Sequence, residues 1–244
     1  MASTERGSVR AEVSAKRVRA YLHGNLVADT VHPLLVWEVP YYPAYYIPRD
    51  DIRAELGPTG ETKHSPSLGD GQVHHVMAGD STVKDAALVY TESPIPELGG
   101  HVRLDWASMT SWFEEDEEVF THVRDPRTRL DILPTSRHVQ VLLGNVVLAE
   151  TTRAHVLFET YLPPRWYVPQ VDVRMDLLRR SDTVTHCPYK GTTVHYTATV
   201  DGHETADVAW SYPTPLPESQ RIAGLLAFYD NRVRVLVDGQ QVGG

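Results

Sequence analysis

The second half of this chain repeats the first half in register. Residues 28–30 (ADT) correspond to residues 149–151 (AET), and residues 43–48 (PAYYIP) correspond to residues 164–169 (PRWYVP), both at an offset of 121 positions. A period of this length indicates a duplicated domain, because short structural repeats recur every 20–50 residues. We therefore expect two copies of one fold.

The correspondence continues after one inserted residue. At an offset of 122, residues 64–66 (HSP) correspond to residues 186–188 (HCP), and Asp85 corresponds to Asp207. Each copy spans about 110 residues, which is enough for a hydrophobic core of its own. The sequence thus favours two small domains over one large one.

These correspondences divide the 244 residues into four segments. Residues 17–120 form repeat 1 and residues 137–244 form repeat 2, with residues 121–136 as the linker. Residues 1–16 are polar and unpatterned, which is typical of a mobile tail. We expect a monomer in which the repeats are related by an approximate two-fold axis, as in a homodimer of single copies.

Most of each repeat alternates with a period of two and is rich in Val, Thr and Tyr, as in Thr193–Val200. This pattern predicts β-strands. Helix-initiating signals, a proline followed by acidic residues, occur only at residues 48–51 and 169–172 and predict helices of two or three turns. We expect a mainly β protein with antiparallel sheets and short helices.

Asp201-Gly202 predicts a two-residue hairpin turn, because this dipeptide readily adopts positive φ. Counting back from that turn places Tyr196 opposite Asp207 and puts His195 and Trp210 on one face of the hairpin. The same register in repeat 1 places His74 opposite Asp85, and it puts Val73 and Leu88 where repeat 2 has His195 and Trp210. On this face, polar and aromatic side chains that could contact a ligand therefore occur in repeat 2 alone.

Composition excludes several classes of partner. The net charge is −9, with no cluster of Lys or Arg, and it opposes binding to a phosphate backbone, so no nucleic acid is expected. No apolar run approaches the ~20 residues that cross a bilayer, and residues 1–22 lack the apolar core of a signal peptide. With the single cysteine Cys187 no intrachain disulfide can form, which fits a cytoplasmic protein.

Several segments resemble a bacterial and fungal family catalogued as domain of unknown function 427, sometimes labelled nucleotidyltransferase-like. They are residues 158–160 (FET), 166–169 (WYVP), 187–191 (CPYKG) and 209–212 (AWSY), together with the connector-like residues 112–119 (WFEEDEEV). The resemblance implies a β-tent, in which two antiparallel sheets cross roughly at right angles, as in zinc-binding relatives. The paired CxxC zinc ligands of those relatives are missing. A P-loop is missing too, which disfavours nucleotidyl transfer.

Three residues of repeat 2 are candidates for chemistry. Cys187 is a possible nucleophile if Lys190 lowers its pKa, although a small buried cysteine is the alternative. His195 suits a general base or a donor to a ligand, with a surface histidine as the alternative. Glu159, which recurs in repeat 1 as Glu38, is a structural carboxylate or a pocket residue.

Further residues are candidates for ligand contact. Lys190 lies in a turn where repeat 1 has Leu68, so the turn itself does not require a cation, and we expect Lys190 at the rim of a pocket as an anion contact. Trp210 and Tyr212 are expected as aromatic walls, and the resemblance places Arg165 or Tyr167 beside Glu159. No metal and no cofactor are expected, and the acidic run 114–118 is expected to be a solvated edge.

The leading hypothesis is a cytosolic protein that binds a small, anionic organic metabolite in repeat 2. The alternatives are a metabolic enzyme that uses Cys187, His195 and Glu159, or a non-catalytic interaction module. The binding hypothesis predicts that the pocket is filled in repeat 1. It also predicts that Lys190→Leu changes stability by no more than about 0.5 kcal/mol and that Trp210→Ala costs much less than the ~3–5 kcal/mol of a packed core tryptophan.

Overall fold

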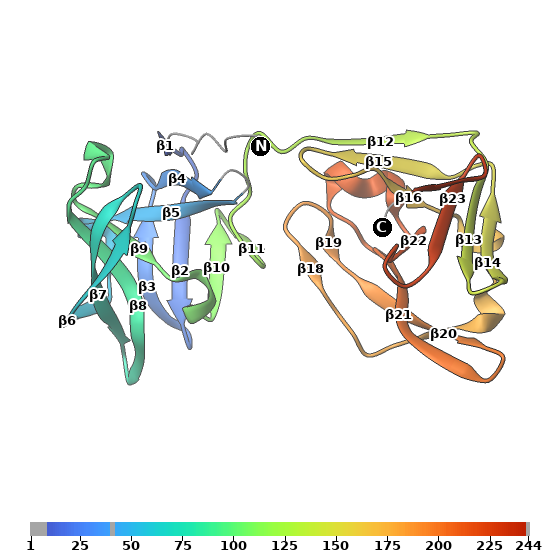
Figure 1. Cartoon of the computed structure of the whole chain (residues 1–244). Coiled ribbons are helices and arrows are strands. Elements are labelled where there is room, and N and C mark those ends of the chain that lie inside the picture. Colours follow the sequence, from blue (N-terminus) through green and yellow to red (C-terminus); the bar gives the residue numbers. More distant parts are fainter. Residues whose placement is uncertain (1–8, 40–41, 243–244) are drawn as a thin grey trace. The chain divides into compact units, whose positions relative to one another are not determined.

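The computed structural model describes residues 9–39 and 42–242, which fall into two compact units (Figure 1). Unit 1 comprises residues 1–125 and unit 2 residues 126–244, coloured blue to green and yellow-green to red. The boundary lies inside the segment expected to link the repeats. Repeat 1 therefore belongs to unit 1 and repeat 2 to unit 2.

Unit 1 is built almost entirely from strands. In chain order they are β1 Arg10–Val13, β2 Val18–Leu22, β3 Asn25–Thr30, β4 Leu34–Val39, β5 Tyr42–Pro48, β6 Glu55–Ser65, β7 Gly69–Ala78, β8 Ser81–Glu92, β9 His101–Leu104, β10 Ser111–Glu114 and β11 Glu117–Val119. They form one sheet in the order β1-β4-β5-β9-β8-β7-β6 and a second in the order β11-β10-β2-β3. Short 3-10 helices interrupt them: η1 Arg49–Asp51, η2 Pro96–Leu98 and η3 Trp106–Ser108.

Unit 2 is also built mainly from strands, and in the described residues these strands form four sheets instead of two. They are β12 Leu130–Pro134, β13 Val139–Leu143, β14 Val146–Thr151, β15 His155–Glu159, β16 Arg165–Tyr167, β17 Leu178–Arg180, β18 His186–Cys187, β19 Gly191–Thr192, β20 Val194–Val200, β21 His203–Ser211, β22 Leu226–Phe228, β23 Arg234–Val237 and β24 Gln240–Val242. The 3-10 helices are η4 Gln170–Asp172, η5 Met175–Leu177 and η6 Pro217–Ile222.

Equivalent strands pair in the same way in both units. The central hairpin β2–β3 and its partner β10 correspond to β13–β14 and β23, and the run β7-β8-β9 corresponds to β20-β21-β22. All pairings between named strands are antiparallel in the described residues. The expectation of a mainly β chain with antiparallel sheets is confirmed, while the two-fold relation between the repeats stays a prediction.

Two segments expected to be irregular contain strands. Arg10–Val13, placed in the mobile tail, forms β1 and pairs with β4. Leu130–Pro134, placed in the linker, forms β12 and pairs with β15. Both strands lie at equivalent positions on the edge of their sheets, where neighbouring strands supply the hydrogen bonds that a short segment lacks by itself. Residues 1–8 of the expected tail lie outside the described residues.

The expected helices of two or three turns are single 3-10 turns. Each is a three-residue element, η1 or η4, and the residue that follows is extended. That residue, Ile52 or Val173, forms a β-bridge to Ala28 or Ala149. Backbone pairing with the central hairpin therefore ends each helix after one turn.

The predicted turn at Asp201-Gly202 is confirmed, with φ of 50° and 77° and with Val200 paired to His203. Two extra residues in β21 then shift the register, so Ala198 pairs with Thr205 whereas Tyr196 pairs with Ala209. This bulge contradicts the expected Tyr196–Asp207 pair. A bulged residue adopts a conformation that an uninterrupted ladder does not contain, and counting back from the turn cannot reveal it.

The same bulge occurs in β8, and it explains why an aspartate recurs. Asp85 and Asp207 have φ of 55° and 49°, a left-handed conformation that aspartate tolerates better than most residues. Asp85 interacts with His75 rather than with the expected His74: its backbone N–H donates to His75 Nδ1 at 3.1 Å. The Asp207 carboxylate accepts hydrogen bonds from Ser181 and Thr183.

A shift of two residues preserves which side of a strand a residue faces. His195 therefore still shares a face with Trp210 and lies directly opposite it, as Val73 lies opposite Leu88 in unit 1. The prediction about this face is correct although the predicted register is wrong. Trp210 belongs to a buried cluster that also contains Ile132, Leu157, Tyr167, Tyr212, Ile222 and Ala227.

The equivalent cluster of unit 1 consists of Leu34, Val36, Tyr46, Leu68, Val73, Leu88, Tyr90 and Leu98. A separate core fills the opposite side of each unit, with Val18, Val27 and Trp112 in unit 1 and Val139, Leu148 and Phe228 in unit 2. Over the described ranges, the search for a long apolar helix able to cross a membrane finds none.

Candidate functional site

A pocket of about 260 Å³ opens beside the Trp210 cluster of unit 2. We call it the Lys190 pocket. It is lined by Leu157, Glu159, Leu162, Pro163, Arg165, Tyr167, Thr185, Lys190, Thr193, Trp210, Tyr212 and Tyr229. Six of the eight candidate site residues named from the sequence are in this lining: Glu159, Arg165, Tyr167, Lys190, Trp210 and Tyr212.

Segments far apart in the chain bring these side chains together. Glu159 ends β15, Arg165 and Tyr167 come from the adjacent β16, and Trp210 comes from β21. Lys190 lies in the tight turn between β18 and β19. Its backbone N–H donates to the Cys187 carbonyl at 3.3 Å. Gly191 follows with φ of 101°, a conformation that glycine adopts readily.

Lys190 forms a buried ion pair with Glu159. The Nζ–Oε2 distance is 2.5 Å, and the two side chains are only 10% and 9% exposed. The expectation of a solvated lysine at the pocket rim is therefore wrong. Removing one partner of a buried pair leaves an uncompensated charge, which costs about 3–5 kcal/mol, so the expectation that Lys190→Leu is neutral for stability does not hold either.

Unit 1 keeps the carboxylate but pairs it with a different cation. Glu38 Oε1 forms an ion pair with Arg103, whose Nε lies 2.8 Å away, and it accepts a hydrogen bond from the Tyr46 hydroxyl at 2.9 Å. Arg103 lies on β9 opposite Leu88, and the equivalent residue of unit 2, opposite Trp210, is Ala227.

The cation has thus moved from one element to another. Unit 1 has leucine at the turn position of Lys190, namely Leu68, which is fully buried, and it has arginine where unit 2 has Ala227. Each unit supplies one cation to the recurring glutamate. This exchange supports the reading of Glu159 as a structural carboxylate, and in addition the residue lines the pocket.

The tyrosines near the carboxylate also differ between the units. In unit 1 the Tyr46 hydroxyl donates to Glu38, and the Tyr90 ring lies beside Tyr46 with their centroids 6.1 Å apart. In the described part of unit 2, no hydrogen bond takes up the hydroxyl proton of the equivalent Tyr167 or Tyr212. Burial raises the pKa of both well above the ordinary value for tyrosine, so both hydroxyls keep their protons and act as donors at neutral pH.

Aromatic rings form one wall of the pocket. The ring centroids of Trp210 and Tyr229 lie 4.3 Å apart, and the rings of Trp210 and Tyr167 make an edge contact. The Arg165 guanidinium lies 5.4 Å from the Trp210 ring centroid, within the range of a cation–π contact. Trp210 is 9% exposed and packs in the core cluster as well as lining the pocket. The expectation that its truncation costs little is therefore wrong.

His195 lies behind the pocket lining. It is 2% exposed, and its Nε2 is hydrogen-bonded to Thr193 Oγ1 at 2.9 Å and to Thr185 Oγ1 at 3.1 Å. Burial lowers the pKa of His195, which favours the neutral ring. Its Nδ1 has no hydrogen-bond partner among the described residues. The ring therefore contacts the pocket lining through hydrogen bonds to the two threonines and by stacking on Tyr229, with ring centroids 6.1 Å apart, and it is not a surface histidine.

Cys187 is outside the pocket lining. It is partly buried and packs against the Trp210 cluster. No hydrogen bond joins its thiol to His195, Glu159 or Lys190 among the described residues. The structure thus does not assemble the nucleophile and base that the enzyme alternative requires.

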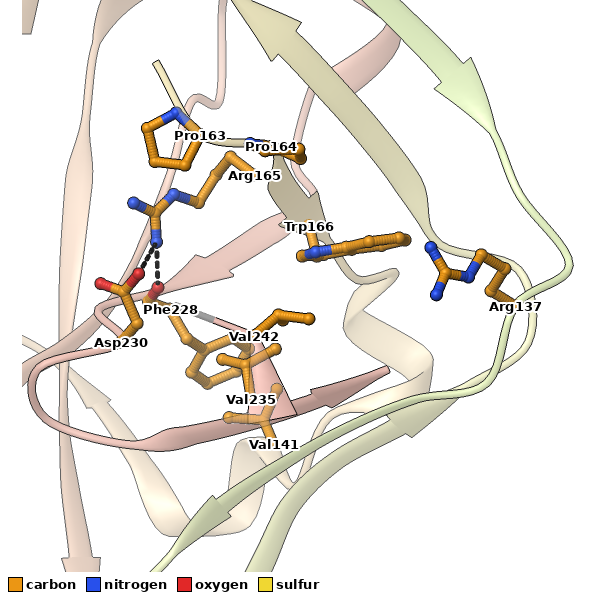
Figure 2. A pocket seen from close by; sticks show the side chains of 10 residues that line it. All are labelled: Arg137, Val141, Pro163, Pro164, Arg165, Trp166, Phe228, Asp230, Val235 and Val242. Carbon is orange, nitrogen blue, oxygen red and sulfur yellow. Dashed lines mark hydrogen bonds and ion pairs between the residues drawn. The ribbon is translucent and has the colours of Figure 1, made fainter. Parts of the chain in front are cut away.

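A second pocket of about 210 Å³ adjoins the first and shares Pro163 and Arg165 with it (Figure 2). Figure 2 shows the Arg165 guanidinium turned toward Asp230 and the Phe228 carbonyl, at 3.4 and 3.1 Å. The other lining residues are mostly apolar: Val141, Pro164, Trp166, Val235 and Val242, with Arg137 beside Trp166. This second pocket supplies few polar groups that could orient a ligand.

Unit 1 is not completely filled on the equivalent face. Leu68, Val73 and Leu88 join a buried apolar cluster, as expected. A pocket of about 330 Å³ nevertheless borders Val73 and Leu88, and its remaining lining includes Arg103 and Asp105. The expectation that this face is closed in repeat 1 is therefore correct only in part. Leu68, Tyr46 and Tyr90, the equivalents of Lys190, Tyr167 and Tyr212, are buried, but a pocket remains beside Val73 and Leu88.

The acidic run forms a hairpin rather than a uniformly solvated edge. Glu114 ends β10 and is 7% exposed, and it accepts from Lys16 and, at 3.0 Å, from the Tyr45 hydroxyl. Glu117 begins β11. Across residues 9–39 and 42–242, no group of three or more His, Cys, Asp and Glu side chains is arranged to hold a metal ion.

Sequence reasoning missed three polar lining residues: Thr185, Thr193 as part of a hydrogen-bond network, and Tyr229. A signal for Tyr229 was available, since the unit 1 residue at the equivalent strand position is Asp105. Extending the internal alignment beyond Tyr212 would have exposed both this difference and the change from Arg103 to Ala227.

Comparison with known proteins agrees with the internal repeat. A search of curated proteins finds no match to this chain. One family model, described as a domain of unknown function (DUF427), matches twice, at residues 10–115 and 131–239. The two matches cover most of the chain and one falls in each unit. The chain therefore belongs to the DUF427 family and carries two copies of its domain.

Proposed function

We propose that unit 2 binds a small anionic organic molecule in the Lys190 pocket. The observation that carries this proposal is the set of ammonium and hydroxyl donors that line that pocket and for which no protein acceptor is found among the described residues. An ammonium group has three N–H donors, and Glu159 takes one from Lys190. The hydroxyls of Tyr167 and Tyr212 add two more donors.

Buried donors without partners cost about 1–3 kcal/mol each. Water or a ligand must therefore satisfy those in the Lys190 pocket, and a ligand that does so must be rich in acceptors. A carboxylate fits this requirement because it is an acceptor only, with two oxygens. The equivalent tyrosine in unit 1, Tyr46, instead donates to Glu38 within the protein.

The charges of the lining point the same way. Lys190 and Arg165 are cations, and Glu159 is the single carboxylate among the lining residues. Asp230 offsets Arg165 from outside the pocket. An anion next to the remaining donors of Lys190 gains charge-assisted hydrogen bonds.

The size and walls of the pocket limit the ligand. A volume of about 260 Å³ is just below the range of ~300–1,000 Å³ for drug-sized ligands. The rings of Trp210 and Tyr229 offer a flat apolar surface. These features favour a metabolite of few atoms with one flat or apolar part and one anionic group, bound in the cytoplasm.

An enzyme built on Cys187, His195 and Glu159 has less support. Glu159 lies in the pocket, whereas Cys187 is outside it and His195 is behind Thr185 and Thr193. We therefore propose binding without assigning a catalytic role to these residues.

A thermal-shift screen of the full chain against small carboxylates, phosphates and amines tests the proposal. A carboxylate at 100 times its dissociation constant should stabilise unit 2 by ~2.7 kcal/mol, a shift of roughly 5–10 °C. Absence of any shift with the anions, or equal shifts with the amines, would contradict the proposal and favour an interaction module.

Two variants at equivalent positions locate the site. Tyr212→Phe removes a hydroxyl from the pocket and should weaken binding of any carboxylate found in the screen. Tyr90→Phe makes the same change in unit 1 and should leave that binding unchanged. Equal effects of the two variants would place the ligand elsewhere.

A further inference from the structure

Glu159 has capacity for a further hydrogen bond inside the Lys190 pocket. Its Oε2 accepts from Lys190. Among the described residues no donor is found for its Oε1. The side chain is 9% exposed and lines the pocket, so a group inside the pocket can donate to the remaining oxygen. A carboxylate oxygen in such a position is an acceptor that awaits a donor.

Unit 1 shows which groups contact this carboxylate. Glu38 Oε1 forms an ion pair with Arg103 and accepts a hydrogen bond from one neutral hydroxyl, that of Tyr46. In unit 2 Lys190 supplies the cation. The neutral hydroxyl is missing, because Tyr167, the equivalent of Tyr46, does not donate to Glu159 in the structure.

Tyr167 therefore has a hydroxyl proton without an acceptor, Glu159 has an oxygen without a donor, and both residues line the same pocket. A hydroxyl group is the small neutral group that both accepts one hydrogen bond and donates another. It can accept from the Tyr167 hydroxyl and donate to Glu159 Oε1, and it would then be the neutral hydroxyl beside this glutamate, as Tyr46 is beside Glu38. A carboxylate or a methyl group cannot make both bonds.

We propose that the Lys190 pocket recognises a hydroxycarboxylic acid, whose hydroxyl binds between Tyr167 and Glu159 and whose carboxylate binds Lys190. This inference rests on the proposed function and names its ligand class. An amino group is a poorer fit than a hydroxyl, because a second cation beside Lys190 would be repelled. Arg103 shows that the recurring glutamate takes one cation, not two.

The experiment measures dissociation constants by titration calorimetry with the full chain. The probes are four matched pairs of acids that differ by one 2-hydroxyl: acetate and glycolate, propionate and lactate, phenylacetate and mandelate, and 3-phenylpropionate and 3-phenyllactate. In each pair that binds, the hydroxy acid should bind about 10- to 100-fold more tightly, the effect of a hydrogen bond to a charged group.

Tyr167→Phe keeps the buried ring and removes only the hydroxyl. This variant should reduce the preference for the hydroxy acid by at least about tenfold, because it weakens binding of the hydroxy acid more than binding of the unsubstituted acid. Tyr90→Phe, which removes a tyrosine hydroxyl from unit 1 instead, should keep the preference. A circular dichroism spectrum and melting temperature like those of the wild type establish that each variant is folded.

The outcomes separate the inference from the proposed function. If both acids of every binding pair bind with equal affinity, the inference is overturned and the proposed function stands. If Tyr167→Phe keeps the preference, or if Tyr90→Phe abolishes it, the hydroxyl lies elsewhere and the inference is likewise overturned. If none of the eight acids binds, both fall.

Discussion

Replacing Lys190 with leucine, the residue of unit 1, should destabilise unit 2 severely. The change leaves the Glu159 carboxylate, which is 9% exposed, without a cation. Loss of one partner from a buried ion pair costs about 3–5 kcal/mol. For a unit of this length the melting temperature should fall by roughly 10–20 °C, measured by differential scanning calorimetry of the full chain.

The arrangement of unit 1 predicts how to restore the loss. The triple variant Lys190→Leu, Trp210→Leu and Ala227→Arg copies Leu68, Leu88 and Arg103, and its new guanidinium can reach Glu159 as Arg103 reaches Glu38.

We therefore expect the triple variant to regain most of the stability. The double variant Lys190→Leu and Trp210→Leu lacks the new cation and should not regain it. This double variant is the matched control for the arginine.

A second control lies in unit 1. Arg103→Ala breaks the equivalent pair, but Glu38 and Arg103 are 27% and 29% exposed, so water can solvate the remaining carboxylate. We expect a cost of only about 1 kcal/mol. The reasoning is refuted if Lys190→Leu costs less than about 1 kcal/mol, or if the triple variant is no more stable than the double variant.

Three further predictions concern single residues. The free energy of unfolding should fall from pH 7 to pH 5, because burial lowers the pKa of His195 and the unfolded chain binds its proton more readily. His195→Val should make this slope shallower by up to about 1.4 kcal/mol per pH unit in urea titrations at pH 5, 6 and 7, and equal slopes would contradict it. Asp207→Val should cost about 1–3 kcal/mol, because a β-branched residue is strained at φ of 49°, whereas Asp207→Asn should cost less; equal melting temperatures would disprove this. Cys187 should react with iodoacetamide more slowly than free cysteine at pH 7.5, since it packs against an aromatic cluster, and faster labelling would revive the nucleophile hypothesis.

The internal repeat made the shared face of the hairpin predictable. The turn at Asp201-Gly202 sets the start of the register, and alternation assigns each residue to a side. The bulge at Asp207 shifted the pairing by two positions, and a shift of two leaves the sides unchanged. His195 and Trp210 were therefore placed correctly although their expected partners were wrong.

The partner of Lys190 was not predictable by the same reasoning. Glu159 lies 31 residues earlier on another strand, and its contact with the turn depends on tertiary packing. One sequence signal existed, namely that Leu68 becomes Lys190 while Arg103 becomes Ala227. Considered alone, the first change reads as a gain of charge at the surface. Considered together, the two changes keep one cation for the glutamate.

Equivalent strands pair in both units, so residues that differ between the units at equivalent positions are not required by the fold itself. In unit 1 Glu38 pairs with Arg103 and accepts a hydrogen bond from Tyr46. The fold can therefore give this tyrosine proton an acceptor within the protein. In the described residues of unit 2, the Tyr167 hydroxyl proton has no acceptor and one Glu159 oxygen has no donor, and both residues line a pocket of about 260 Å³.

A polar group that loses water without gaining a hydrogen-bond partner costs about 1–3 kcal/mol. Stability alone would therefore favour the hydrogen bond between tyrosine and glutamate that unit 1 contains. Water in the pocket can recover part of that cost without conferring selectivity. A ligand with matching acceptor and donor atoms recovers it only when bound, and the recovered energy then appears as affinity. Under the proposed function, the Tyr167 proton is therefore a group that a ligand satisfies, whereas the equivalent Tyr46 proton is satisfied by Glu38 within the protein.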